Sequence, residues 1–270
     1  MTTLTVVAPG WATTIQDGGR HGFAALGVPR SGALDADRQH LVNRLVGNDP
    51  DAAVLETAGG LTLRAGGPAV VATSAELVPR SVTDGDVIEV NPAAGELWGY
   101  VAVRGGVAVD AVLGSRSNDT LSGIGPVPLV ASMQLPVGPD PGTPITTDQA
   151  ATRPRPATLE VWPGPRVDWF ADDALDVLTA TAWTVTGDVS RIGTRLDGPP
   201  LRRRRTDELP SEGLVLGAIQ VPADGRPLVM LADHPTTGGY PVLAVVDSAH
   251  VGAVAQSRPG ATIRFRLHRR

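Results

Sequence analysis

The chain contains 270 residues and neither cysteine nor lysine, so its 23 basic side chains are all arginines. Disulfides, thiolate metal sites, cysteine nucleophiles, lysine Schiff bases and the lysine of a phosphate-binding P-loop are therefore excluded. The net charge of −5 argues against nucleic-acid binding. The longest uncharged stretch, residues 121–139, is too rich in proline to span a membrane, and no leader sequence is recognisable, so we expect a cytoplasmic protein.

Frequent glycine and proline divide the chain into short apolar runs, which predicts a mainly β protein with a few short helices. The expected strands, in chain order, are 4–7, 69–73, 86–90, 100–103, 159–162, 183–185, 216–221, 228–231, 242–246 and 262–267. Asp35 is expected to cap a helix that runs to Val46, because apolar residues recur there at helical spacing. Two further helices are expected at 168–178 and 248–257.

The segment 136–157 is rich in proline and lacks apolar periodicity, and we interpret it as a linker. It separates an N-terminal β-rich half, residues 1–135, from a C-terminal β-rich half, residues 158–270. A long ordered loop that crosses one intertwined domain is the alternative interpretation.

Glycine and polar residues are concentrated near the N-terminus, in residues 9–20 and 27–35. Asp17 and Arg20 could pair with each other or bind a polar ligand, and the structural interpretation is favoured. Ser31 and Asp35 are interpreted as turn and cap residues, because no histidine stands at a defined spacing from either.

Two arginines flank a glycine in the stretch 187–196. If this stretch is a strand, Arg191, Gly193 and Arg195 lie on one face. Guanidinium groups match the geometry of carboxylate and phosphate, so this face could form an anion-binding cradle. An exposed edge strand protected by charge explains the pattern equally well.

The densest polar cluster lies in residues 231–241, between two apolar runs that are typical of strands. The cluster combines a carboxylate, an imidazole, two hydroxyls, two glycines and a phenol: Asp233, His234, Thr236, Thr237, Gly238, Gly239 and Tyr240. Glu212 and Gln220 come from the neighbouring segments. A hairpin whose polar side chains cap their own backbone is the alternative interpretation. The five histidines are scattered, and no metal site is predicted.

Several motifs carry a resemblance that extends nearly from end to end. They lie at 9–20, 27–35, 43–48, 55–56, 104–106, 113–117, 163–166, 190–196, 217–222 and 233–241. In these motifs the chain resembles the biotin-dependent carboxyltransferase-like family known as allophanate hydrolase subunit 2. Leu34, Ile192 and Pro235 depart from the residues that are commoner in this family.

The resemblance implies a cyclophilin-like β-barrel architecture and a separate partner, the KipI-like subunit 1. The family includes the C component of the ATP-dependent 5-oxoprolinase, which acts with a KipI-like B component and with an A component that is LamB/YcsF-like. ATP would be bound by the complex at a site that the sequence does not locate, and this chain is expected to carry no covalent biotin. The expected substrate is a small amide.

Within the resemblance, Asp233 and His234 are expected to be catalytic, as groups that move a proton. Arg191, Arg195 and the glycine amides would stabilise negative charge. The expected substrate-binding residues are Arg191, Arg195, Glu212, Gln220, Thr236, Thr237, Gly238, Gly239 and Tyr240.

Three functions fit the resemblance. The first is activation of the 5-oxoproline lactam for hydrolysis to glutamate. The second is carboxyl transfer to urea or allophanate. The third is a KipA-like regulator that binds a KipI-like kinase inhibitor.

Overall fold

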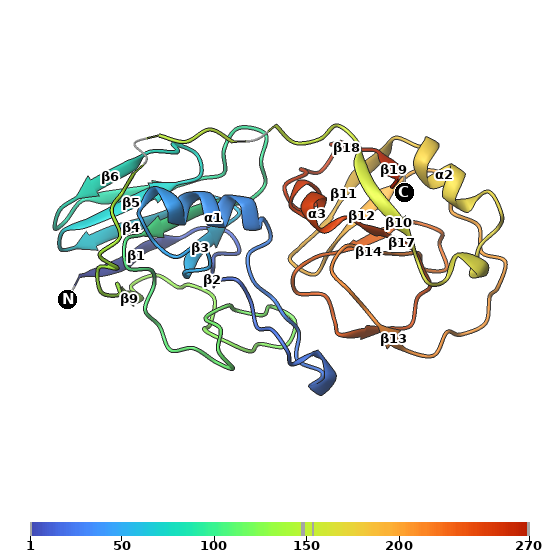
Figure 1. Ribbon diagram of the computed structural model, residues 1–270, viewed down its shortest axis with the longest axis horizontal. Coiled ribbons are helices and arrows are strands. Elements are labelled where there is room, and N and C mark those ends of the chain that lie inside the picture. Colours follow the sequence, from blue (N-terminus) through green and yellow to red (C-terminus); the bar gives the residue numbers. More distant parts are fainter. Residues whose placement is uncertain (1, 147–148, 153, 269–270) are drawn as a thin grey trace. The chain divides into compact units, whose positions relative to one another are not determined.

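The computed structural model describes residues 2–146, 149–152 and 154–268, which fold into two compact units (Figure 1). Unit 1 comprises Met1–His21 and Ser31–Arg153, and unit 2 comprises Gly22–Arg30 and Pro154–Arg270. The expected linker, residues 136–157, therefore begins in unit 1, and its residues 147, 148 and 153 lie outside the described part of the chain.

Unit 1 contains a four-stranded sheet in the order β7-β4-β1-β9 and a five-stranded sheet in the order β2-β3-β8-β5-β6. Its strands are β1 (Thr3–Pro9), β2 (Thr14–Gln16), β3 (Val54–Thr57), β4 (Leu61–Gly66), β5 (Ala69–Thr73), β6 (Pro79–Val82), β7 (Val87–Val90), β8 (Gly99–Val103) and β9 (Gln134–Pro136). Apolar side chains from both sheets share one core, with Leu4 and Leu63 from the first sheet and Leu55 and Val101 from the second. The two sheets are thus held together by burial of their facing apolar residues.

The helix α1 (Ala36–Leu45) packs against β8 and β5 of this unit. The side chain of Asp35 accepts a hydrogen bond from the Arg38 amide at 3.2 Å, which satisfies an amide in the first helical turn. The predicted cap is therefore confirmed.

Unit 2 is built on one eight-stranded sheet in the order β18-β11-β12-β15-β14-β17-β10-β19. Its strands are β10 (Leu159–Pro163), β11 (Trp183–Val189), β12 (Gly193–Asp197), β14 (Ala218–Gln220), β15 (Leu228–Met230), β17 (Val242–Val246), β18 (Thr262–Ile263) and β19 (Phe265–Leu267). Arg264 alone separates β18 from β19, the two outermost strands of the sheet. Because segments separated by a single residue occupy opposite edges, the sheet curls almost into a closed barrel.

Short helices and one ribbon complete unit 2. The α-helices are α2 (Ala174–Ala180) and α3 (Ser248–Ala255), the 3-10 helices are η1 (Ala24–Leu26) and η2 (Val167–Trp169), and the ribbon pairs β13 (Glu212–Gly213) with β16 (Thr237–Gly238). The mainly β, barrel-like architecture expected from the sequence is confirmed. One expected strand, 262–267, is divided in two at Arg264, where the chain turns from one edge of the sheet to the other.

Candidate functional site

The polar loop 231–241 connects β15 to β17 and is fixed by a small ribbon of its own. Glu212 pairs with Gly238 and Gly213 with Thr237, and the Leu214 amide donates to the Thr236 carbonyl at 2.9 Å. The loop is therefore an ordered part of unit 2, because backbone groups of residues 236–238 are hydrogen-bonded to residues 212–214.

Asp233 is fully buried in an ion pair with Arg191. The guanidinium donates from Nε to Asp233 Oδ2 at 2.8 Å and from Nη2 to Oδ1 at 2.9 Å, and the two side chains are 0% and 2% exposed. The Asp233 amide also donates to the Arg191 carbonyl at 2.9 Å. A bidentate pair of this kind fixes orientation as well as charge. Asp233 therefore holds the start of the loop in place and does not face a substrate in this arrangement.

Arg191 reaches the interior because the chain turns just before β12. The Ser190 amide donates to the Gly193 carbonyl at 3.1 Å, and regular pairing begins only at Gly193. Arg195, inside the strand, instead reaches outward to Asp224 at 3.1 Å and to Asp188 at 3.7 Å. The structure therefore directs the two arginines of the expected cradle to different carboxylates.

His234 is half-buried, and its ring orientation is fixed by its own loop. Nδ1 lies 2.7 Å from the Pro235 carbonyl oxygen, which can accept a hydrogen bond but has no hydrogen to donate. Nδ1 therefore carries the hydrogen, and in the neutral ring Nε2 is left as a proton acceptor. Of the two residues expected to be catalytic, His234 is the one whose geometry suits proton transfer.

The rest of the loop combines close packing with exposed polar groups. A Cβ on Gly238 would lie 2.7 Å from both Gln220 Nε2 and Leu214 Cδ1, so the ends of these two side chains would have to move to admit a larger residue. Gln220 Nε2 donates to the Tyr240 carbonyl at 3.1 Å. Thr237 and Tyr240 are exposed, and the Tyr240 phenol can meet a ligand from solvent.

Glu212 is already matched by a cation from the neighbouring segment. Arg166 Nε donates to Glu212 Oε2 at 2.9 Å, and a second guanidinium nitrogen contacts Oε1. Glu212 lies beside Gly238 through the ribbon, and its charge is neutralised by Arg166.

The glycine-rich motifs of unit 1 form a buried polar network of their own. The hydroxyls of Ser115 and Ser117 each donate to Asp17 Oδ1 at 2.6 Å, and the Arg116 amide donates to Oδ2 at 2.5 Å. Arg20 donates from Nη2 to the Ser117 carbonyl at 2.5 Å. Asp17 and Arg20 thus both bind the segment 115–117, which gives the two side chains a structural role through that segment.

A second buried cluster in unit 1 centres on Tyr100. Its hydroxyl donates to Glu56 Oε2 at 2.8 Å and accepts from the Asp35 amide at 2.9 Å. Burial, and then the neighbouring Glu56 and Asp35, raise the pKa of Tyr100 well above its ordinary value. The phenol is therefore held neutral and ties the start of α1 to β8 and β3.

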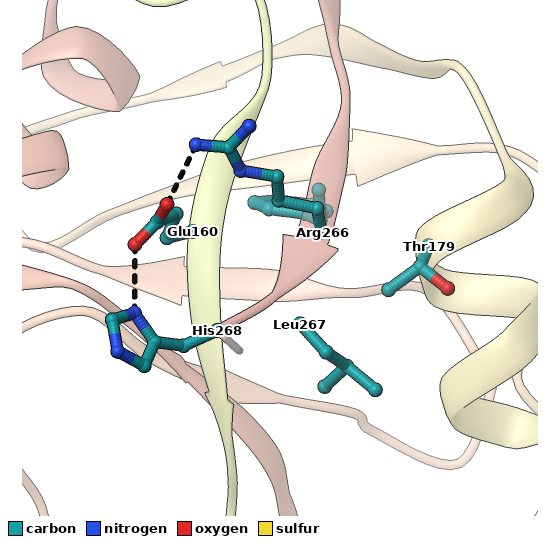
Figure 2. A pocket seen from close by; sticks show the side chains of 6 residues that line it. Glu160, Thr179, Arg266, Leu267 and His268 are labelled. Atoms are coloured by element: carbon teal, nitrogen blue, oxygen red, sulfur yellow. Dashed lines mark hydrogen bonds and ion pairs between the residues drawn. The ribbon is translucent and has the colours of Figure 1, made fainter. Parts of the chain in front are cut away.

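A cavity of about 710 Å³ lies beside Glu160, Arg266 and His268, which the sequence did not single out (Figure 2). Figure 2 shows Arg266 and His268 both directed at the Glu160 carboxylate, with distances of 2.6 Å to Oε1 and 2.7 Å to Oε2. These bonds, from His268 first and Arg266 second, hold the pKa of Glu160 below its ordinary value. Trp162 stacks on His268 with ring centroids 3.9 Å apart.

This cavity lies away from the polar loop. The loop enters β17 at Val242, whereas Asp247, just after the other end of that strand, donates its amide to the Glu160 carbonyl at 2.9 Å. A strand of this length separates the two places by roughly 15 Å. The alternation of Glu160 with Trp162, and of Arg266 with His268, was the sequence signal that could have placed these side chains on one outer face.

Among the described residues there is neither a cluster of metal-binding side chains nor a helix that could span a membrane. No group of three or more histidine, cysteine, aspartate or glutamate side chains suited to a metal ion occurs among them. No helix in residues 2–146, 149–152 and 154–268 is long and apolar enough to cross a bilayer.

The fold and its two units are those of a carboxyltransferase domain. The family described as carboxyltransferase domain, subdomain A and B, matches residues 26–267, and the chain belongs to this family. The sequence is 32% identical to the C component of the 5-oxoprolinase of Escherichia coli, over 97% of this chain and 90% of that protein.

Two solved structures share the fold. The structure of TTHA0988 superposes with a TM-score of 0.87 at 35% identity, covering 98% of this chain and 55% of the other. The urea carboxylase of Kluyveromyces lactis superposes with a TM-score of 0.88 at 29% identity, covering 97% of this chain and 27% of the other. The chain thus spans about half the length of the first protein and about a quarter of the second.

Proposed function

We propose that this chain is the C component of an ATP-dependent 5-oxoprolinase, acting in the cytoplasm in a complex. A KipI-like B component and a LamB/YcsF-like A component are its proposed partners, and the complex activates the lactam of 5-oxoproline for hydrolysis to glutamate. The observation that carries the proposal is similarity along nearly the whole chain to the C components of two 5-oxoprolinases: 32% identity over 97% of this chain for Escherichia coli and 29% over 93% for Haemophilus influenzae.

The polar loop supplies the chemistry that opening a lactam requires. His234 presents Nε2 as a proton acceptor, and the exposed Thr237 and Tyr240 can orient a small amide. The ion pair of Asp233 with Arg191 keeps the loop in place. ATP is assigned to the complex rather than to a site in this chain, which has neither lysine nor a P-loop.

Carboxyl transfer to urea or allophanate is the second candidate. It is favoured by the family match over residues 26–267 and by the close superposition on urea carboxylase. Both reactions need a polarised amide beside a proton acceptor, so the loop alone does not distinguish them.

Turnover by the purified complex tests the proposal directly. The three proteins are combined with ATP and 5-oxoproline, and glutamate and ADP are measured together. The proposal predicts equal amounts of both products and none without ATP. If the three proteins together form no glutamate but urea is carboxylated by carboxybiotin, the second candidate is favoured. Tight binding to a KipI-like protein with neither activity would favour the regulator.

Substitution of His234 tests the proposed site. His234→Gln is expected to lower kcat by about 10²–10⁴-fold, because general base catalysis typically contributes this much. KM should change little if the ring acts mainly on the proton. His250→Gln is the matched control, since His250 lies on α3 and accepts a bond from the Glu160 amide. Equal activity of His234→Gln and the unchanged complex would remove His234 from the mechanism.

A further inference from the structure

The four consecutive arginines 202–205 have unlike environments. Arg202 contacts Asp173 at 2.6 Å, Arg204 contacts Asp172, and Arg205 lies 3.8 Å from Asp168. These three charges are thus matched by carboxylates of the segment 168–173. Three of the four arginines are thus surface residues whose charge is paired with a carboxylate.

Arg203 is the exception. Its Nε donates to the Val221 carbonyl at 3.1 Å, and Nη2 contacts the same oxygen. A carbonyl carries no net charge, so the guanidinium charge is not neutralised by this bond. Within the described part of the chain, no carboxylate forms an ion pair with Arg203, and the edge that carries Nη1 makes no hydrogen bond to protein. The bond to Val221 fixes the group and leaves one donor edge for a ligand.

Arg203 lies beside the polar loop. The Val221 amide donates to the Pro241 carbonyl at 3.1 Å, so the carbonyl that holds Arg203 belongs to a residue joined to the end of the loop. Burial lowers the pKa of Arg203, and the neighbouring Tyr240 and Asp224 oppose that change. The Tyr240 phenol is therefore close enough to Arg203 to interact with its charge.

A cavity of about 430 Å³ is lined by Leu201, Arg203, Thr206 and Asp224, among others. The Asp224 carboxylate does not compete for Arg203 as an ion-pair partner, because Arg195 Nη1 and the Arg226 amide each bind it at 3.1 Å. This volume is within the range of small-molecule sites.

The other arginines around the loop are already paired. Arg191 is matched by Asp233, Arg195 by Asp224, and Arg166 by Glu212. A negatively charged substrate group needs a cation, and the chain contains no lysine to provide one. We propose that Arg203 binds the carboxylate of the substrate and so selects small amides that carry one. This inference rests on the proposed function and adds the residue that recognises the acid group.

The test compares Arg203→Gln with Arg204→Gln in the complex of all three proteins. Both substitutions remove one charge from the same run, but Arg204 lies outside the lining of the cavity and is paired with Asp172. Loss of a charged hydrogen bond is expected to weaken 5-oxoproline binding by about 10–100-fold in Arg203→Gln, measured by calorimetry and as KM. Arg204→Gln should stay within about two-fold of the unchanged complex. Arg203→Lys should recover part of the loss, since it restores the charge without the planar fork.

A second ligand isolates the carboxylate. 2-Pyrrolidinone has the lactam ring without the acid, so Arg203→Gln should leave its weak binding unchanged. Equal loss for both ligands, or equal 5-oxoproline binding by the two variants, would overturn the inference.

Failure of the Arg203 site can be distinguished from failure of the proposed function. If the unchanged complex neither binds nor turns over 5-oxoproline, the proposed function fails. The Arg203 site is then titrated with a panel of small carboxylates. Binding that Arg203→Gln abolishes and Arg204→Gln retains would support the site, and a lack of any Arg203-dependent binding would refute it.

Discussion

Removal of the Arg191 guanidinium should destabilise unit 2 strongly. Arg191 and Asp233 are 2% and 0% exposed and share two bonds of 2.8 and 2.9 Å, so Arg191→Met takes the paired cation away from a buried carboxylate. Breaking a buried pair in this way costs about 3–5 kcal/mol in free energy of unfolding. The cost follows from desolvation of the remaining charge more than from the lost attraction.

Urea unfolding measures this cost, because three of the five tryptophans, Trp162, Trp169 and Trp183, lie in unit 2 and report its transition by fluorescence. Arg195→Met is the matched control: Arg195 is 27% exposed and pairs with an exposed Asp224, so its removal should cost at most about 1 kcal/mol.

The double variant Arg191→Met/Asp233→Leu separates charge from packing. It should be more stable than Arg191→Met alone, because no buried charge is left without a partner. If Arg191→Met unfolded at the same urea concentration as Arg195→Met, the buried pair would not hold the loop and the reasoning would be refuted.

Two further outcomes test other features. Gly238→Ala should lower the free energy of unfolding by about 1 kcal/mol, because its Cβ would displace the Gln220 amide that donates to the Tyr240 carbonyl, whereas Gly213→Ala in the same ribbon meets nothing within 4 Å; equal midpoints in urea would contradict this. In Tyr240→Phe, Tyr100 is the only tyrosine, and its raised pKa makes its stabilising contribution complete below pH 10 and lost as the pH rises further. Phenolate absorbance should then appear together with loss of circular dichroism, and titration of a folded protein near pH 10 would refute the burial of Tyr100.

Much of the fold follows from local patterns. The runs 69–73 and 242–246 coincide with β5 and β17, and Asp35 caps α1 as its position before an apolar stripe predicts. β3 was not predicted, because its four residues are all buried and lack the polar alternation that marks a half-exposed strand. β4 does alternate between buried and more exposed residues from Leu61 to Ala65, so its sequence carries the period-two pattern of a strand.

The site was less accessible to sequence reasoning for a physical reason. An aspartate before a histidine suits either a catalytic group or a buried anchor, and the distinction depends on Arg191, which lies 42 positions away in the chain. The alternation that placed Arg191 beside Arg195 failed because the turn at Ser190 comes before the strand begins. Arg203 stands in a run of four arginines, and such a run is by itself typical of a solvated, exposed loop, so the sequence does not distinguish it from its neighbours.

The segment Gly22–Arg30 belongs to unit 2 although unit 1 encloses it in the sequence. The ribosome therefore releases part of unit 2 long before the rest of that unit exists, and the segment must wait while unit 1 is synthesised around it. No single cut divides the chain into its two units, since a fragment that begins at Pro154 lacks these residues. Neither unit can therefore be expressed as one continuous segment of the chain, even though each has its own sheets.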